Sequence, residues 1–325
     1  MKSYSVRLYQ KGDFVLWNSF LEIAKNATFL FHREFMEYHS HKFDDYSLLV
    51  FENAKLVGIL PANRVENTIF SHQGLTYGGL VLLEKAKLIE VISIFKSILI
   101  FLNQKKIQKL NIKMFPSFYN DTFTEELNYC LFLLNASLLR CDTFSVIDLQ
   151  KKIKIGSGRK EGVFNGIENN LEIREVSDFE PFWNKILIPN LNNKHSANPV
   201  HNLQEIELLY KKFPKNIRQF NVYRNGIIIA GTTIFESKNV AHSQYISGNE
   251  TKNETGSLDF LHYNLILTVF KNKAFFDFGT SNEQQGRKLN KGLLFWKESF
   301  GAKTVVQNFY EVETKNYNLL ENIFI

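Results

Sequence analysis

The chain has 325 residues, and 39 Lys and Arg against 33 Asp and Glu give it a formal net charge of +6. Hydrophobic residues make up 44% and charged residues 22%, ordinary globular values that argue against a disordered chain. Six Pro, 17 Gly and two Cys exclude a collagen-like chain, a disulfide framework and a four-Cys zinc site.

No targeting or membrane-spanning segment is evident. The N-terminus lacks the apolar core of a signal peptide. The longest apolar stretch, 88–102, contains Glu90 and Lys96 and is shorter than the roughly 18 residues that a span needs. We therefore expect a cytoplasmic protein without a transmembrane segment, which can at most contact a membrane surface.

Strands and helices alternate along the first half, the pattern of a mixed α/β protein. Strands are predicted at 3–9, 47–52, 55–64, 76–82, 109–115 and 145–149, and helices at 13–25, 85–104 and 124–135. The basic, glycine-containing stretch 151–160 then predicts a solvated linker. Its glycines in GSGRKEG do not have the spacing of a dinucleotide or P-loop motif.

The second half restarts the same order of elements. Strands are predicted at 171–176, 217–224, 227–236, 240–247, 274–279 and 303–312, and helices at 178–187, 202–212, 257–272 and 289–299. LVFENAKLVGIL from Leu49 aligns with NVYRNGIIIAGT from Asn221, with a tight turn at Asn53 or Asn225 in each. This predicts a duplicated domain, 1–160 and 161–325, each copy built on a mostly antiparallel sheet.

Longer motifs carry a resemblance to a known family. In the first half they are FLFHREFMEYHSHKFDDYSLLVF at 29–51, LPAN at 60–63 and SHQGLTYGG at 71–79. In the second they are KHSANPVHNLQEI at 194–206, AHSQYISGN at 241–249, SLDFLHYNLI at 257–266, FDFGTSNEQQGRKLNKGL at 276–293 and WKESFGA at 296–302. With these motifs the chain resembles the FemAB-like acyltransferases, a tandem form of the GNAT fold. The motifs look like those of a FemAB-related branch of GNAT acetyltransferases that is common in bacterial surface-polysaccharide gene clusters.

The resemblance implies two GNAT-like domains, the second carrying the catalytic residues. It implies an N-acyltransferase, foremost an acetyltransferase, that uses acyl-coenzyme A as co-substrate and needs no metal. The acceptor would be the amine of a nucleotide- or lipid-linked amino sugar for a surface polysaccharide, and DNA is not an expected partner. Two alternatives stay open: FemAB-type transfer from aminoacyl-tRNA to a cell-wall precursor, and a non-catalytic carbohydrate-binding module.

One loop bears on whether the acyl donor is acetyl-coenzyme A or aminoacyl-tRNA. GNAT enzymes usually bind the coenzyme A pyrophosphate at a basic, glycine-containing loop before the central helix, through backbone N–H groups. The corresponding stretch here, GNETKNETG at 248–256, contains Glu250 and Glu254 and is a poor anion cradle. This weighs against acetyl-coenzyme A, and FemAB proteins proper use aminoacyl-tRNA.

Lys297 is the first candidate for catalysis. Acyl transfer to an amine needs a donor for the developing oxyanion and a group that removes a proton. WKESFG resembles the Phe-Lys…Phe-Gly motif of FemAB proteins, whose Lys is implicated in stabilising the acyl-transfer intermediate; Trp296 stands here for the Phe. A surface Lys paired with Glu298 remains the alternative from the residues alone.

DFGTSNE places further candidates at the end of a strand. Glu283 has the chemistry to take a proton from an amine, and Asp277 is the third expected catalytic residue. For Asp277 and Ser281, turn formation and helix capping are open alternatives. Within the resembling motifs, Ser281, Asn290 and Trp296 are expected to bind substrate, as are His242 and Gln244.

KHSANPVHNLQE brings Lys194, His195, His201 and Glu205 together as expected substrate-binding residues. His201 and Glu205 are four apart, the spacing of a base and its orienting partner on one helix face. A surface pair at a helix start is equally open. No third ligand at metal-site spacing is evident, so no metal is expected.

The first half adds SHQGLTYGG, where His72, Gln73 and Tyr77 lie beside Gly78-Gly79 and suit a sugar or nucleotide surface. A buried histidine in a β-bulge is the alternative. Arg33 is the expected phosphate-binding residue, because its guanidinium matches phosphate geometry.

Overall fold

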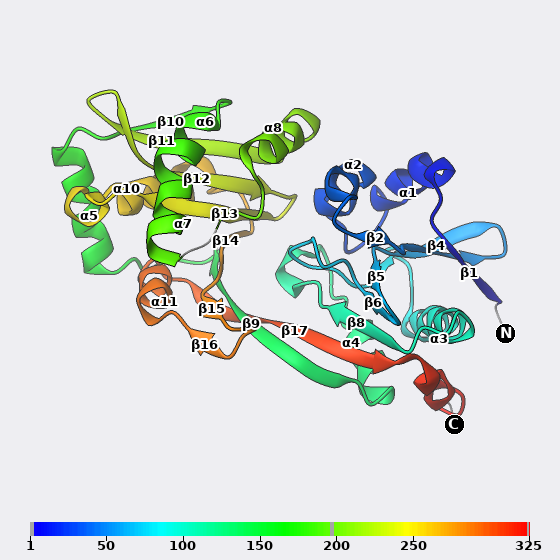
Figure 1. Cartoon of the computed structure of the whole chain (residues 1–325). Helices are drawn as coiled ribbons and strands as arrows, with labels where there is room; N and C mark the ends of the chain where they lie inside the picture. Colours follow the sequence, from blue (N-terminus) through cyan, green and yellow to red (C-terminus); the bar gives the residue numbers. More distant parts are fainter. Residues whose placement is uncertain (1–2, 196–197, 324) are drawn as a thin grey trace. The chain divides into compact units, whose positions relative to one another are not determined.

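Figure 1 shows the computed structural model, which describes residues 3–195, 198–323 and 325. The chain divides into unit 1, Met1–Asp142 with Val306–Ile325, and unit 2, Thr143–Val305. The chain passes from unit 1 to unit 2 within the strand β9 (Ser137–Asp148) and returns to unit 1 within the strand β17 (Lys303–Glu313).

Unit 2 is built on a sheet in the order β10-β11-β12-β13-β14-β9. Its strands are β9 (Ser137–Asp148), β10 (Glu172–Val176), β11 (Ile217–Arg224), β12 (Ile227–Glu236), β13 (Val240–Gly248) and β14 (Phe275–Thr280). Neighbouring strands are antiparallel except β13 and β14, which run parallel. β15 (Asn282–Glu283) and β16 (Lys288–Leu289) form a separate small ribbon.

Helices cover this sheet, and α7 crosses its strands in Figure 1. They are α5 (Ser157–Glu168), α6 (Glu180–Phe182), the π-helical η5 (Trp183–Leu187), α7 (Ile188–His195), α8 (Leu203–Lys212), α9 (Lys252–Thr255), α10 (Ser257–Asn264), the π-helical η6 (Leu265–Val269) and α11 (Lys291–Glu298). The core between α10 and β14 is apolar and includes Leu261, Leu265, Phe276, Phe278 and Phe300. Burial of these side chains supplies the main favourable free energy for this layer.

Unit 1 holds one sheet in the order β1-β3-β4-β7 and a series of strands β17-β8-β6-β5-β2. The strands are β1 (Tyr4–Leu8), β2 (Asp44–Asp45), β3 (Leu48–Glu52), β4 (Lys55–Leu60), β5 (Asn63–Val65), β6 (Thr68–Phe70), β7 (Val81–Leu82), β8 (Lys109–Lys113) and β17 (Lys303–Glu313). The helices are α1 (Phe14–Leu21), α2 (Arg33–Met36), α3 (Leu88–Gln104) and α4 (Glu126–Leu133). The mixed α/β fold with mostly antiparallel sheets, expected from the sequence, is confirmed.

The two aligned hairpins share their irregularities. Asn53 and Asn225 both adopt left-handed backbone, with φ 54° and 52°, as tight hairpin turns require. Each hairpin then carries one extra residue at the same aligned position, Val57 in β4 and Ile229 in β12. The strand orders β1-β3-β4-β7 and β10-β11-β12-β13 also correspond. The duplication predicted from sequence thus has a structural counterpart in each unit.

The units exchange their final strands. β9, which ends the first repeat in sequence, pairs with β14 of unit 2, and β17, which ends the second, pairs with β8 of unit 1. For this reason residues 306–325 belong to unit 1. The domain border expected after residue 160 falls inside α5, within unit 2.

The stretch 151–160, expected to be a solvated linker, is largely exposed, but from Ser157 onward it forms the start of a packed helix, α5. Gly162 of α5 and Gly256, just before α10, let the two helices approach each other. A Cβ on Gly162 would lie 2.1 Å from Asp259 Oδ2, and one on Gly256 would lie 1.9 Å from the Gly162 carbonyl oxygen. Sequence reasoning missed this helix because its contact face consists of glycines among charged residues and so shows no apolar pattern of helical spacing. Among the described helices, none combines the length and apolar character needed to cross a membrane.

Candidate active site in unit 2

A cavity of about 830 Å³ opens in unit 2 where two parallel strands part. β13 and β14 pair only from Val240 and Phe275 to His242 and Asp277. Beyond that point their side chains line the cavity from both sides: Ser243, Gln244, Ile246 and Ser247 of β13, and Phe278 and Thr280 of β14. Such a parting of neighbouring strands is a place where sheets offer room for a ligand.

Helices complete the walls. Polar and charged lining residues come from α5, α7, α9, α10, β15 and α11: Arg159, Glu161, Asn165, Asn190, Lys252, Asn253, Asp259, Glu283, Asn290 and Lys297. Five of the sequence-predicted site residues therefore line one cavity: Gln244, Glu283, Asn290, Trp296 and Lys297.

Lys297 lies in the last turn of α11 and is 2% exposed. Its Nζ donates to the carbonyl oxygens of Gly279 at 3.0 Å and Thr280 at 2.7 Å, at the end of β14. Burial lowers the pKa of Lys297 to about 8, although the charge of Asp277 opposes this. An ammonium has three N–H donors, so the two carbonyl groups leave one for a ligand in the cavity.

Glu283 and Asn290 lie close together at the cavity. Asn290 caps α11, accepting the Leu293 N–H at 3.0 Å, and its Nδ2 donates to Glu283 Oε1 at 3.4 Å. Glu283 is otherwise exposed, so its carboxylate can receive a proton from a cavity ligand or from solvent. Ser281 is buried nearby, with its backbone oxygen accepting the Asn290 N–H at 2.9 Å, and it does not belong to the cavity lining.

Asp277 is fully buried and lies outside the cavity lining. Its Oδ2 lies 2.8 Å from His242 Nδ1, and its Oδ1 accepts the Gly279 N–H at 2.7 Å. Asp277 thereby fixes both the ring of His242 and the turn whose carbonyl group holds Lys297. The structure places Asp277 and His242 behind the cavity wall, where they can orient the residues that face a ligand.

Sequence reasoning missed a buried carboxylate in the cavity. Asp259 of α10 accepts hydrogen bonds from Arg159 Nη1 and from the indole N–H of Trp296, both at 2.7 Å to Oδ1. Burial raises the pKa of Asp259, while Trp296 and Arg159 oppose the shift. Arg159 and Asp259 are 100 positions apart in the sequence, so no local pattern indicates that they are in contact, although Asp259 lies within the resembling motif at 257–266.

The described residues of the motif at 194–206 do not line the cavity. The side chains of Lys194 and His195 lie outside the described part of the chain, so their predicted role stays a prediction. α8 begins at Leu203, after His201, and Glu205 forms a capping box with Asn202. His201 is buried, and its Nδ1 lies 2.6 Å from the Tyr245 hydroxyl oxygen. His201 and Glu205 are therefore not on one face of α8.

The candidates of SHQGLTYGG lie in unit 1. His72 is buried with φ 63°, and burial, followed by the charge of nearby His39, lowers its pKa to about 3. The Tyr77 hydroxyl shares a hydrogen bond of 2.8 Å with Thr28 inside the core, and exposed Gln73 pairs with Asn63. Gly78 lies against the Ser71 carbonyl group, which leaves no space for a Cβ.

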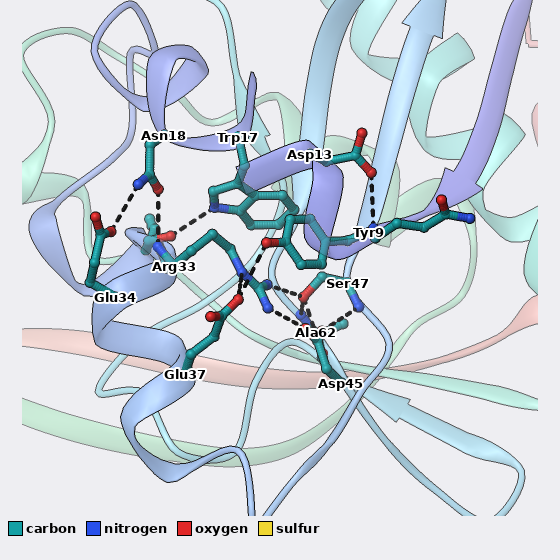
Figure 2. A network of polar contacts seen from close by, with 12 residues as sticks. Tyr9, Asp13, Trp17, Asn18, Arg33, Glu34, Glu37, Asp45, Ser47 and Ala62 are labelled. Atoms are coloured by element: carbon teal, nitrogen blue, oxygen red, sulfur yellow. Dashed lines mark hydrogen bonds and ion pairs between the residues drawn. The ribbon is translucent and has the colours of Figure 1, made fainter. Parts of the chain in front are cut away.

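Arg33 is buried inside a network of its own unit (Figure 2). Its guanidinium donates to Glu37 Oε1 at 3.0 Å, to Asp45 and to Ser47 Oγ at 3.3 Å, and it stacks 3.7 Å from the ring centroid of Tyr9. Two carboxylates already balance its charge. This arrangement is suited to holding α2 against β2 and β3 rather than to receiving a phosphate.

We therefore expect Arg33→Met to act on stability. Removing the guanidinium leaves Asp45 and Glu37 without their cation, and part-buried ion pairs of this kind typically contribute about 1–3 kcal/mol. Thermal unfolding followed by circular dichroism should show a lower transition than for wild type. Arg64→Met, which removes an exposed hydrogen bond to the Glu66 carbonyl group, is the matched control and should change little. Unchanged stability with weakened binding of a phosphate-bearing ligand would contradict this assignment.

No model of a known protein family matches the sequence, and no curated protein matches it either. Solved structures do match across nearly the whole chain. FemX superposes with a TM-score of 0.68 at 9% identity, over 98% of this chain and 99% of FemX. L-PGS from Bacillus licheniformis gives 0.62 at 11% identity, over 97% and 96%. A tandem GNAT protein from the clavulanic acid biosynthesis pathway gives 0.50 at 10% identity, over 97% and 99%. The chain therefore has a FemAB-like fold of two GNAT-type domains.

Proposed function

We propose that the protein is an N-acyltransferase that joins an acyl group to an amine in the unit 2 cavity. The observation that carries the proposal is the buried ammonium of Lys297, which lines the cavity with one N–H to spare. A donor held there stabilises the oxygen that becomes negative when an amine attacks a carbonyl carbon. Because the negative charge on the acyl oxygen appears only in the transition state, this contact lowers the barrier and not merely the energy of the bound substrate.

The reaction forms one C–N bond and breaks the bond between the acyl carbon and its carrier. The attacking nitrogen loses a proton, and the carrier sulfur or oxygen leaves with one. We assign Glu283 as the proton acceptor, because its carboxylate lines the same cavity and is open to solvent. Asp277 and His242 serve as positioning residues behind Lys297.

For the substrates we propose acyl-coenzyme A, foremost acetyl-coenzyme A, as donor and an amino sugar of a surface-polysaccharide precursor as acceptor. Several neutral polar groups around the cavity suit a sugar: Asn165, Asn190, Ser243, Ser247 and Asn253. The cavity volume of about 830 Å³ accommodates a monosaccharide with part of a carrier.

One observation favours aminoacyl-tRNA as a second candidate donor. A pyrophosphate needs free backbone N–H groups at a helix start. The start of α10 instead has Ser257 fully buried, Gly256 against the Gly162 carbonyl group of α5, and the Asp259 carboxylate facing the cavity. These features disfavour the binding of a pyrophosphate at the start of α10. They therefore favour aminoacyl-tRNA, a donor that does not need a pyrophosphate site there.

Native mass spectrometry with two donor panels tests the proposal. One panel contains acyl-coenzyme A esters, the other aminoacylated tRNAs, each with and without nucleotide-linked amino sugars. We expect a bound donor and an acceptor whose mass rises by one acyl group. Binding of sugars with no mass change under either donor panel would favour the carbohydrate-binding alternative and overturn the proposed transfer.

The lowered pKa of Lys297 predicts two opposite pH effects. Turnover should fall as pH rises through about 8, because the ammonium is lost. Stability should change the other way: the unfolded chain, with Lys near 10.5, binds this proton at pH values where the folded chain does not, so unfolding free energy rises with pH between about 8 and 10.5. Denaturant titrations of wild type and Lys297→Met isolate this term, because other groups cancel in the difference. A difference that stays constant across this window would contradict the assigned pKa.

A further inference from the structure

Asn282 lies where the chain leaves the sheet of unit 2 and enters the β15–β16 ribbon. Backbone pairing of β14 with β9 ends at Thr280 and Phe144. The neighbouring backbone N–H of β9, that of Thr143, donates instead to Asn282 Oδ1 at 2.7 Å. The Asn282 side chain thus takes the place of a strand partner and joins the ribbon to the sheet.

The other hydrogen bonds of Asn282 fix the orientation of its amide. Thr143 Oγ1 and Thr280 Oγ1 donate to the same Oδ1, at 2.8 Å and 3.0 Å. At the opposite end of the amide, Nδ2 donates to the Gly286 carbonyl oxygen at 3.2 Å. A backbone N–H can only donate and a backbone carbonyl group can only accept, so the two ends of the amide cannot be exchanged.

The turn of the ribbon depends on such support. Gln284, Gln285 and Gly286 follow one another with φ of 48°, 53° and 83°. Left-handed backbone is unfavourable for residues other than Gly, and it persists only where surrounding contacts impose it. Besides the pairing of β15 with β16, the contacts at this turn include the bond from Asn282 to Gly286 and a bond from the Arg287 N–H to the Gln284 carbonyl oxygen at 3.2 Å.

The two groups that the proposed reaction needs are both connected to the segment that Asn282 holds. The Thr280 carbonyl oxygen accepts a hydrogen bond from Lys297 Nζ at 2.7 Å, and Glu283 directly follows Asn282. Within the described residues, the Glu283 carboxylate receives one side-chain hydrogen bond, from Asn290 Nδ2 at 3.4 Å. The place of Glu283 relative to Lys297 therefore depends on the backbone of the ribbon, and hence on Asn282.

We propose that Asn282, hydrogen-bonded to Thr143 of β9, is a positioning residue that holds Glu283 and the carbonyl group bound to Lys297 in their places at the cavity. The inference rests on the proposed function and adds a residue outside the cavity lining that sets the geometry of the lining. Misplacement of a reacting group by about 1 Å can lower a rate by about 100-fold. Loss of Asn282 should therefore affect turnover far more than substrate binding.

Steady-state kinetics of the full chain, with the donor and amino sugar identified by native mass spectrometry, tests the inference. Asn282→Ala should lower turnover by about 10- to 100-fold and change the Michaelis constant of the acceptor by less than about twofold. Thr143→Val keeps the backbone N–H but removes one of the three donors to Oδ1, so it should lower turnover by about 2- to 10-fold. Thr143→Ser restores that donor and should restore turnover.

Asn216→Ala is the matched control. Asn216 also lies in unit 2, and its Nδ2 donates to the Glu236 carbonyl oxygen at 2.9 Å, outside the cavity lining. Its removal should leave turnover as in wild type. Thermal unfolding followed by circular dichroism shows which variants are folded at the assay temperature.

A double-mutant cycle separates positioning from a general contribution to folding. If Asn282 acts through Glu283, Asn282→Ala should lower turnover by a much smaller factor in Glu283→Gln than in wild type. A merely structural effect would give the same factor in both backgrounds. If Asn282→Ala does not fold, Thr143→Val and Thr143→Ser in the two backgrounds give the same comparison.

The outcomes distinguish this inference from the proposed function. Equal factors in the two backgrounds, or normal turnover of folded Asn282→Ala while Glu283→Gln is impaired, overturns the inference and leaves the proposed function intact. Normal turnover of Glu283→Gln contradicts the assigned proton acceptor, and the inference with it. Transfer by wild type with neither donor panel would overturn the proposed function itself together with the role of Asn282.

Discussion

Lys297→Met is expected to lower turnover by about 100- to 1000-fold while changing the Michaelis constant for the acceptor little. The reason is that the Lys297 ammonium pairs with charge that develops on the acyl oxygen only in the transition state. Loss of one oxyanion donor typically has an effect of this size. Met preserves the length and apolar stem of the side chain, and removal of a buried charge with a lowered pKa should not unfold unit 2.

Steady-state kinetics with the donor identified by mass spectrometry is the measurement. Lys291→Met is the matched control, since Lys291 begins the same helix and is exposed; it should behave as wild type. A Lys that binds donor phosphate would show a different pattern, with near-normal turnover and a raised Michaelis constant. That pattern in Lys297→Met would contradict the oxyanion role.

Gly256→Ala is expected to destabilise unit 2 by about 2–4 kcal/mol. Gly256 has φ 64°, a left-handed conformation that is unfavourable by about 1 kcal/mol for Ala. In addition, a Cβ would lie 1.9 Å from the Gly162 carbonyl oxygen, so α5 and α10 would have to move apart. Such overpacking adds about 1–3 kcal/mol. Arg159 and Asp259 lie on these two helices, so their ion pair and the cavity wall should be disturbed as well.

Urea denaturation of Gly256→Ala and Gly226→Ala separates the two contributions. Gly226 also has left-handed backbone, with φ 76°, but a Cβ there meets no atom within 4 Å. Gly226→Ala should therefore show only the conformational effect of about 1 kcal/mol. Equal destabilisation by the two variants would mean that α5 does not pack on Gly256 as described.

The sequence predicted structure correctly where the same local pattern of residues occurs in both halves of the chain. The paired hairpins were predictable because Asn53 and Asn225 each interrupt an apolar run with a residue that tolerates left-handed backbone. The exchange of β9 and β17 between units could not be predicted, because pairing with β14 or β8 depends on chain path and not on composition. The start of α5 was misread as a linker for a related reason: Gly162 and Gly166 are favourable in this helix only because α10 lies against them.

At the candidate site, too, residues close in sequence could be predicted, whereas contacts between distant segments could not. Glu283 and Asn290 belong to the motif at 276–293, and Lys297 belongs to the neighbouring motif at 296–302. These adjacent motifs predicted all three as site residues, and all three line one cavity. Asp259 and Arg159 come from distant elements, and their pairing is visible only in three dimensions. Arg33 shows the opposite error, since a lone Arg suggests an anion site, whereas Glu37 and Asp45 already neutralise it.

The most direct test of the account is the carbonyl stretching frequency of a bound donor labelled with ¹³C at the acyl carbon. If the Lys297 ammonium donates to the acyl oxygen in the unit 2 cavity, the infrared band of the bound donor should lie at lower frequency than in solution. In Lys297→Met the band should return toward the solution position, with the donor still bound. A band at the same position in wild type and in Lys297→Met would contradict the central claim that this ammonium polarises the acyl group.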